Sequence, residues 1–243
     1  MKAIILLTWR ECSRRAFYPV AGAVIVAFVA TSRLFIGFAF GAEATETTNL
    51  AISAVFAAGL LHAALLGSSV VRIDRERGTL GLILSKPVGL EAYLAGRFIG
   101  HVMSAVLFAT VVAVSTYAVL GLMPEGGGHA AHHHAQAASE PILGACARAL
   151  IPIPVLVAAS ILFSATVPGF AAPIAVVVLF AAGSLARGGI AGVALPDFSL
   201  FGLEALARPP LPPLVAYGAL FSFFFLLLAY ILLATRLPLR SEG

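Results

Sequence analysis

Histidine is the residue type in this sequence best suited to site chemistry, and four of the six histidines gather in one low-complexity segment. Residues 123–140 are rich in glycine and alanine and contain His129, His132, His133 and His134. His129, His132 and His133 would share one face of a helix, and neutral imidazoles suit Cu(II), Ni(II) or Zn(II). The segment is therefore a candidate metal-binding loop, and a histidine-rich loop without function is the alternative.

The other two histidines, His62 and His101, fall in apolar stretches. Ionisable groups within a membrane segment are functional candidates. His62 lies near the middle of its stretch and is a candidate residue of a substrate pathway. The alternative is a histidine that is hydrogen-bonded to a neighbouring helix. His101 lies one helical turn after Arg97, and we expect its side chain to reach toward the membrane interface.

The motifs of membrane enzymes and of nucleotide hydrolysis are absent from the sequence. It has no G-x-S-x-G, H-E-x-x-H or phosphate loop, and its two lysines, Lys2 and Lys86, do not follow the glycines that such a loop needs. We therefore expect no enzymatic activity and no ATP hydrolysis by this chain. A membrane enzyme that acts without a partner is a further alternative. Cys12 and Cys146 are expected near opposite membrane faces, so neither a disulfide nor a cysteine metal framework is implied.

The composition excludes the soluble classes of protein. The 243 residues are 60% hydrophobic and only 11% charged, and the mean hydropathy is +1.02. A soluble domain carries about 25% charged residues, and this chain would leave large apolar patches in water. We predict an all-α polytopic membrane protein that does not bind nucleic acid, because its small basic excess serves topology.

Six transmembrane helices are predicted, since about 20 apolar residues cross the hydrocarbon core. The stretch 149–186 has 38 residues without Asp, Glu, Lys or Arg, which is too long for one crossing, and it divides at the turn signal in residues 166–169. The expected crossings are 16–32, 50–71, 98–122, the two halves of 149–186, and 209–235.

The positions of lysine and arginine predict the orientation. With the N-terminus inside, most of the 15 basic residues lie on the cytoplasmic side, and six crossings return the C-terminus to that side. Residues 1–15 are expected to form an interfacial helix, with a solvated flank as the alternative. Residues 188–208 are expected to form an outer re-entrant or interfacial segment.

The link between the second and third crossings is predicted to be a helix, a short helix and a helix. Residues 72–77 extend the second crossing, and Gly78 ends that helix in a left-handed cap. Thr79 is expected to cap a short apolar helix over 80–84, which residues 85–87 stop. Such an apolar stub is shaped to enter a groove on another protein, and a loop packed on lipid is the alternative.

This link resembles the signature of the ABC type-2 exporter permeases, E-(K/R)-G-T-L-x-x-L-L-(S/T)-x-P followed by Y-x-x-G-(K/R). The matching runs are Asp74-Arg75-Glu76-Arg77-Gly78-Thr79-Leu80, Leu84-Ser85-Lys86-Pro87-Val88, Tyr93 and Gly96-Arg97-Phe98. The likeness extends over nearly the whole chain. The subgroup most similar in appearance is the permease that accompanies nitrous-oxide reductase maturation. Gly81 departs from the pattern, because the family often has an acidic residue there.

The resemblance implies one permease domain over 1–243, whose cytoplasmic coupling loop, 72–97, docks a separate ATP-binding subunit. ATP and magnesium would belong to that subunit, with no cofactor in this chain. The implied coupling residues are Arg72, Asp74, Arg75, Glu76, Arg77, Gly78, Thr79, Leu80, Leu84, Ser85, Lys86 and Pro87. A second cytoplasmic contact is implied at Ser164, Thr166, Pro168 and Gly169.

The resemblance also implies a dimer with a second permease copy or a homologue, in the inner membrane of a bacterium, with both termini cytoplasmic. We expect export or extraction of a substrate, and a lipid-like or amphiphilic one is favoured because the crossings carry few charges. The alternative is a mechanotransmitting subunit that drives periplasmic metal-centre or protein assembly without bulk transport, together with a periplasmic accessory protein.

Overall fold

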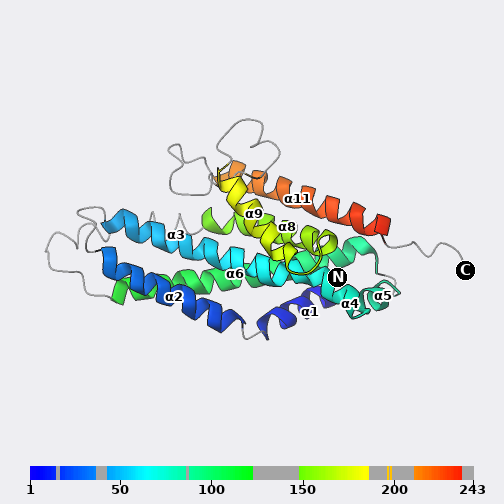
Figure 1. Cartoon of the computed structure of the whole chain (residues 1–243), viewed down its shortest axis with the longest axis horizontal. Coiled ribbons are helices and arrows are strands. Elements are labelled where there is room, and N and C mark those ends of the chain that lie inside the picture. Colours follow the sequence, from blue (N-terminus) through cyan, green and yellow to red (C-terminus); the bar gives the residue numbers. More distant parts are fainter. Residues whose placement is uncertain are drawn as a thin grey trace, which may run out of the picture.

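The computed structural model describes residues 1–14, 17–36, 43–85, 88–122, 148–185, 196, 198 and 211–236, and within them every regular element is helical. This confirms the predicted all-α class. The main helices, labelled in Figure 1, are α1 (Lys2–Ser13), α2 (Phe17–Ile36), α3 (Glu43–Leu61), α4 (Val70–Glu76), α5 (Thr79–Leu84), α6 (Leu90–Leu122), α8 (Pro152–Thr166), α9 (Ala171–Leu185) and α11 (Leu211–Arg236).

Four helical runs in the described residues are long and apolar enough to cross a membrane: Ile52–Glu76, Leu90–Thr116, Arg148–Thr166 and Pro212–Thr235. The helices α1 and α2, which meet at 57°, make a fifth if the bent pair is one span. At about 1.5 Å per residue, the 15 residues of α9 reach about 22 Å, less than a hydrocarbon core of about 30 Å. The chain is therefore a polytopic membrane protein, and the count of six stays a prediction.

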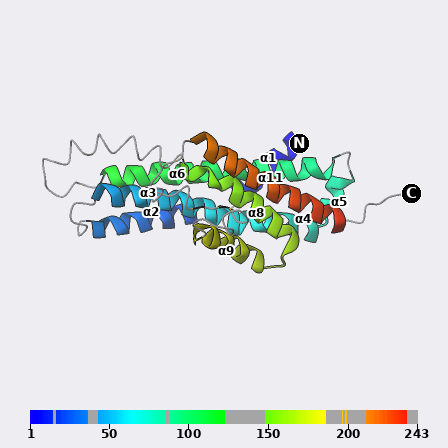
Figure 2. The ribbon, with the colours of Figure 1, turned by 90° about the horizontal axis from the view of Figure 1, so that it is seen from above.

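The helix α8 lies at the centre of the packing. Most of its side chains are buried, and it packs against α11, α9 and the run from α3 to α4. The helices α2, α3 and α6 lie side by side, as both views show (Figures 1 and 2). The break between α8 and α9 falls at residues 167–170, where the turn signal predicted it.

The helices α1, α4 and α5 gather at one end of the bundle, and the last turns of α11 run toward the same end (Figure 1). We call this the α5 end. The 33-residue helix α6 starts there at Leu90, about two turns before the predicted crossing of residues 98–122. These extra turns carry α6 alongside α1.

The helix α1 lies within the residues predicted to form an N-terminal helix, and it packs against α6. Its buried residues, Ile4, Thr8 and Cys12, recur every four positions and form one face. Gly96 and Gly100 of α6 let the two helices approach closely. A Cβ at Gly100 would lie 2.6 Å from Cβ of Thr8.

Between α3 and α4 the helix changes its hydrogen-bonding period without breaking. Residues His62–Leu66 form a π-helix and Gly67–Ser69 a 3-10 helix. Gly67 allows the close approach of Ser160 on α8 at this point. Such irregular turns often occur at functional sites, and this one begins at His62.

Candidate functional site

The α5 end holds a buried ion pair between Asp74 on α4 and Arg97 on α6. The Nη2 atom of Arg97 donates to Oδ1 of Asp74 at 2.8 Å and to Oδ2 at 2.6 Å. The hydroxyl of Tyr93 donates to the same Oδ2 at 2.6 Å. Arg97 is only 2% exposed, so its charge depends on these partners. Buried charges are tolerated when such hydrogen bonds pair them.

The other terminal nitrogen of Arg97 reaches α1. Its Nη1 donates to Oε2 of Glu11 at 2.6 Å and to Oγ1 of Thr8 at 3.2 Å. One guanidinium therefore joins α1, α4 and α6. We refer to Thr8, Glu11, Asp74, Tyr93 and Arg97 as the Arg97 network.

The helix α5 is attached to this network through Thr79. The Thr79 hydroxyl donates to the backbone oxygen of Asp74 at 3.1 Å and lies 3.3 Å from its Oδ1. The expectation that Thr79 caps α5 is therefore wrong, because its side chain turns back to α4. The N-cap of α5 is Gly78, whose φ of 68° confirms the predicted left-handed turn. Glycine adopts this conformation at little steric cost.

The predicted coupling residues fall into an exposed group and a buried group. Asp74 and Leu80 are buried and hold α4 and α5 against the bundle. Arg72 is half-buried and lies 3.8 Å from Glu76. The exposed group is Arg75, Glu76, Arg77, Gly78 and Ser85. Leu84 belongs to α5, while Lys86 and Pro87 lie outside the described residues.

One hydrophobic residue of the predicted apolar stub, Leu82, lies on the exposed face of α5, although the implied coupling residues do not include it. The side chain of Leu82 is 67% exposed. Leu82 and Leu80 both belong to the six-residue helix α5, and Leu80 lies on the opposite, buried face. The helices α4 and α5 with their connecting turn therefore form a braced projection with an apolar tip, which we call the α4–α5 hairpin.

The predicted second contact lies close to the hairpin. Ser164 is buried, and its Oγ accepts hydrogen bonds from the backbone nitrogens of Val71 at 2.9 Å and Arg72 at 3.2 Å. Its role within this chain is thus to hold the start of α4 against α8. The Thr166 hydroxyl donates to the carbonyl of Leu162 within α8.

The turn after α8 carries the exposed part of this second region. Pro168 is exposed, and Gly169 has a φ of 56°. Phe170, which sequence reasoning did not select, has 91% of its side chain exposed. Each of the two regions therefore presents a large exposed hydrophobic side chain, Leu82 in the first and Phe170 in the second.

The two intrahelical histidines meet in the interior. His62 is fully buried, its Nδ1 lies 3.0 Å from the hydroxyl of Tyr18, and its Nε2 lies 3.3 Å from Nδ1 of His101. His62 is thus hydrogen-bonded to neighbouring helices, as its alternative interpretation has it. The expectation that His101 reaches toward the interface is wrong, because this side chain is 3% exposed and points to His62. His129, His132, His133 and His134, and the segment 188–208 apart from Pro196 and Phe198, lie outside the described residues.

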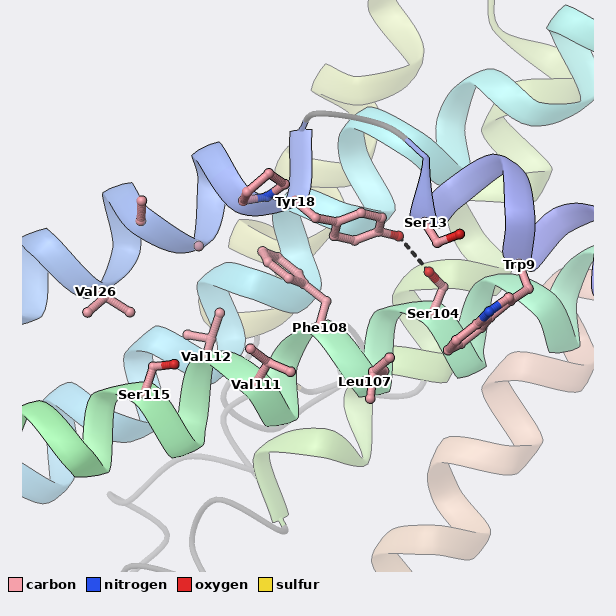
Figure 3. A pocket seen from close by; sticks show the side chains of 13 residues that line it. Trp9, Ser13, Tyr18, Val26, Ser104, Leu107, Phe108, Val111, Val112 and Ser115 are labelled. Atoms are coloured by element: carbon pink, nitrogen blue, oxygen red, sulfur yellow. Dashed lines mark hydrogen bonds between the residues drawn. The ribbon is translucent and has the colours of Figure 1, made fainter.

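A groove of about 510 Å³ runs between α2 and α6 and ends at α1. Figure 3 shows its wall: Trp9, Ser13, the Tyr18 hydroxyl and Ser104 gather toward one end, and the other part is mainly apolar. The Tyr18 hydroxyl lies 2.6 Å from Oγ of Ser104. The groove therefore has a polar end and a mainly apolar remainder, which is complementary to an amphiphilic molecule.

Two comparisons with known proteins bear on the chain. The family model for ABC-2 type transporters matches residues 2–132, which is more than half of the 243 residues. The matched region includes α1 to α6 and hence the Arg97 network, the α4–α5 hairpin and the groove. Comparison with curated proteins finds no match.

Proposed function

Because this chain belongs to the ABC-2 type transporter family, we propose that it couples ATP hydrolysis in a separate subunit to export or extraction of a substrate. Family membership makes the chain a permease subunit of an ABC transporter, a membrane transport component that works with an ATP-binding partner. The narrower resemblance to the permease of nitrous-oxide reductase maturation stays a prediction.

The observation that carries the proposal is the bracing of the α4–α5 hairpin. Thr79 and Asp74 tie the hairpin to Arg97, and Arg97 is itself tied to α1 through Glu11. A push on the hairpin would therefore move α1 and α6 with it instead of bending a loose loop. Rigid-body rotation of a bundle about an interface is a standard mode of switching.

The exposed residues of the hairpin suit a protein partner. Leu82 supplies an apolar anchor on α5, and the exposed charged residues Arg75, Glu76 and Arg77 lie at the end of α4 in the same hairpin. A short helix with one apolar anchor and a polar rim fits a groove on a partner. We place the α5 end in the cytoplasm, where an ATP-binding subunit would dock, and with it both termini. Dimerisation with a second permease copy or a homologue, in a bacterial inner membrane, belongs to the same proposal.

Replacing Leu82 by aspartate is expected to weaken docking of the cognate ATP-binding subunit about tenfold or more, because a charge would enter an apolar groove. A tenfold change corresponds to about 1.4 kcal/mol. The measurement is co-purification and ATP hydrolysis of the complete transporter in nanodiscs. Leu82→Met is the matched control and should stay within about twofold of the parent. Equal hydrolysis by Leu82→Asp and the parent would refute docking through the hairpin.

The groove between α2 and α6 supports an amphiphilic substrate. Its mainly apolar part can accommodate an acyl chain, and the polar atoms near Trp9 and Ser13 can receive a head group. The groove is connected to the α4–α5 hairpin through α1. Trp9 and Ser13 of α1 line the groove, and Glu11 of the same helix binds Arg97, to which the hairpin is attached. Movement of the hairpin would therefore change the polar end of the groove.

Filling the groove is expected to reduce bound amphiphile. Ala23→Phe places a ring on a lining position of α2, whereas Ala27→Phe places the same ring one turn further along, at an exposed position that does not line the groove. We expect retained phospholipid, measured by native mass spectrometry after delipidating purification, to fall several-fold for Ala23→Phe alone. An equal loss in both variants, or in neither, would favour the mechanotransmitting alternative without bulk transport.

A further inference from the structure

We propose that Cys12, His62 and His101 form a binding site for one thiophilic metal ion, Zn²⁺ or Cu⁺, in the interior of the α5 end. The three residues come from α1, from the start of the π-helix and from α6. All three are buried, and their ligand atoms lie within 4.8 Å of one another. This site is separate from the histidine-rich segment 123–140 and from the transport function proposed above.

The distances among the ligand atoms fit a single ion. Zinc–nitrogen and zinc–sulfur bonds of about 2.0 and 2.3 Å in a tetrahedron give edges of about 3.3 Å between two nitrogens and about 3.6 Å between nitrogen and sulfur. Nε2 of His62 lies 3.3 Å from Nδ1 of His101, and Sγ of Cys12 lies 3.6 Å from the same Nδ1. Two edges of the triangle thus have the lengths that coordination requires.

The surroundings of His62 supply the outer hydrogen bond that a metal-bound histidine usually makes. If Nε2 binds the ion, Nδ1 carries the proton and donates it to the Tyr18 hydroxyl oxygen at 3.0 Å. The Tyr18 hydroxyl can then donate to Oγ of Ser104 at 2.6 Å. This chain of hydrogen bonds sets the tautomer and the ring orientation of His62.

A polar cavity gives the site room and an access route. About 240 Å³ in volume, it is lined by Cys12 and His101 and also by Glu11, Asp74 and Arg97. A cavity of this size holds water, so the fourth coordination position is open to a water molecule or to another small donor. A site with three protein ligands and one open position is a known arrangement for zinc.

The donor set decides the class of ion. A cysteine thiolate with two neutral imidazoles favours Zn²⁺ or Cu⁺ over the hard ions Mg²⁺ and Ca²⁺, which take oxygen ligands. Binding releases the thiol proton, because the thiolate is the ligand. The proposal departs from the expectation from sequence that the cysteines imply no metal framework, because the three residues are far apart in the chain and meet only in the fold.

The test uses the full-length chain in detergent, without a histidine tag, with His129, His132, His133 and His134 changed to alanine and Cys146 to serine. Zn²⁺ and Cu⁺ are titrated separately against a chromophoric chelator. We expect about one equivalent of at least one ion per chain, and at least tenfold weaker binding in Cys12→Ser and in His101→Gln. Tyr18→Phe should weaken binding about tenfold, as loss of an outer partner does, and Thr110→Ala, at an exposed position of α6, is the neutral control.

A second measurement does not depend on how the variants fold. X-ray absorption of the metal-loaded parent should show one sulfur and two imidazole nitrogens around the ion. Binding of Zn²⁺ alone or Cu⁺ alone with this ligand set supports the site and identifies the ion. Failure of the parent to bind either ion near one equivalent, or binding without a sulfur ligand, would leave a purely hydrogen-bonded cluster and overturn the proposal.

Discussion

Arg97→Met is expected to destabilise the protein by about 3–5 kcal/mol, because it leaves the buried carboxylate of Asp74 without its cation. The variant keeps the aliphatic stem of the side chain, so little packing is lost. The side chain of Asp74 is only 8% exposed, and water in the cavity beside it would not supply the positive charge of the guanidinium. Unfolding in detergent micelles, followed by heat or by denaturant, measures the loss.

Glu11→Gln is the matched control for this prediction. Glu11 also pairs with Arg97, but its side chain is 44% exposed and water can satisfy it. We expect a loss of at most about 1 kcal/mol. Asp74→Asn combined with Arg97→Met should recover part of the stability lost in Arg97→Met alone, because no buried charge is then left unpaired and the exposed Glu11 is hydrated. Similar losses in Arg97→Met and Glu11→Gln would contradict a buried, charge-dependent network.

Gly100→Leu is expected to displace α1 from α6. A Cβ at this position would already lie 2.6 Å from Cβ of Thr8 and 3.1 Å from the backbone oxygen of Ile5. Overpacking of this kind costs about 1–3 kcal/mol, and backbone atoms cannot move aside as a side-chain tip can. The displacement would also remove Thr8 and Glu11 from Arg97.

Labelling of Cys12 reports this displacement directly. Cys12 is 3% exposed in the docked helix, so maleimide should react with it slowly. In a Cys146→Ser background, Gly100→Leu should speed the reaction by an order of magnitude or more. Gly81→Leu is the control, since a Cβ there meets nothing within 4 Å. Unchanged labelling in Gly100→Leu would show that α1 does not depend on this close approach.

The two predictions concern the same structural unit. Arg97 holds α1 through charge and hydrogen bonds, and Gly100 leaves the space that α1 needs to approach α6 closely. The two residues lie one turn apart on α6. Loss of either should therefore loosen the support of the α4–α5 hairpin while leaving Leu82 at its surface. Variants of the support and variants of the surface can thus be told apart, because only the former should change stability.

Much of the fold follows from local properties of the chain. Apolar stretches with few charges predict membrane helices, because in lipid the backbone N–H and C=O groups can form hydrogen bonds only with one another. Gly78 and the turn at residues 166–169 were predictable since left-handed turns and helix ends depend on neighbouring residues. The position of the α4–α5 hairpin between two long helices follows from the same signals.

What the tertiary structure alone decided is which polar residues meet. Arg97, placed by sequence in the permease signature and among the basic residues beside the membrane, is the buried centre of a network, because α1 docks across it. Cys12, His62 and His101 are far apart in the chain, and nothing in their spacing predicts the cluster that they form. Local sequence determines where helices begin and end, whereas contacts between distant polar groups depend on how the helices pack, which no local pattern records.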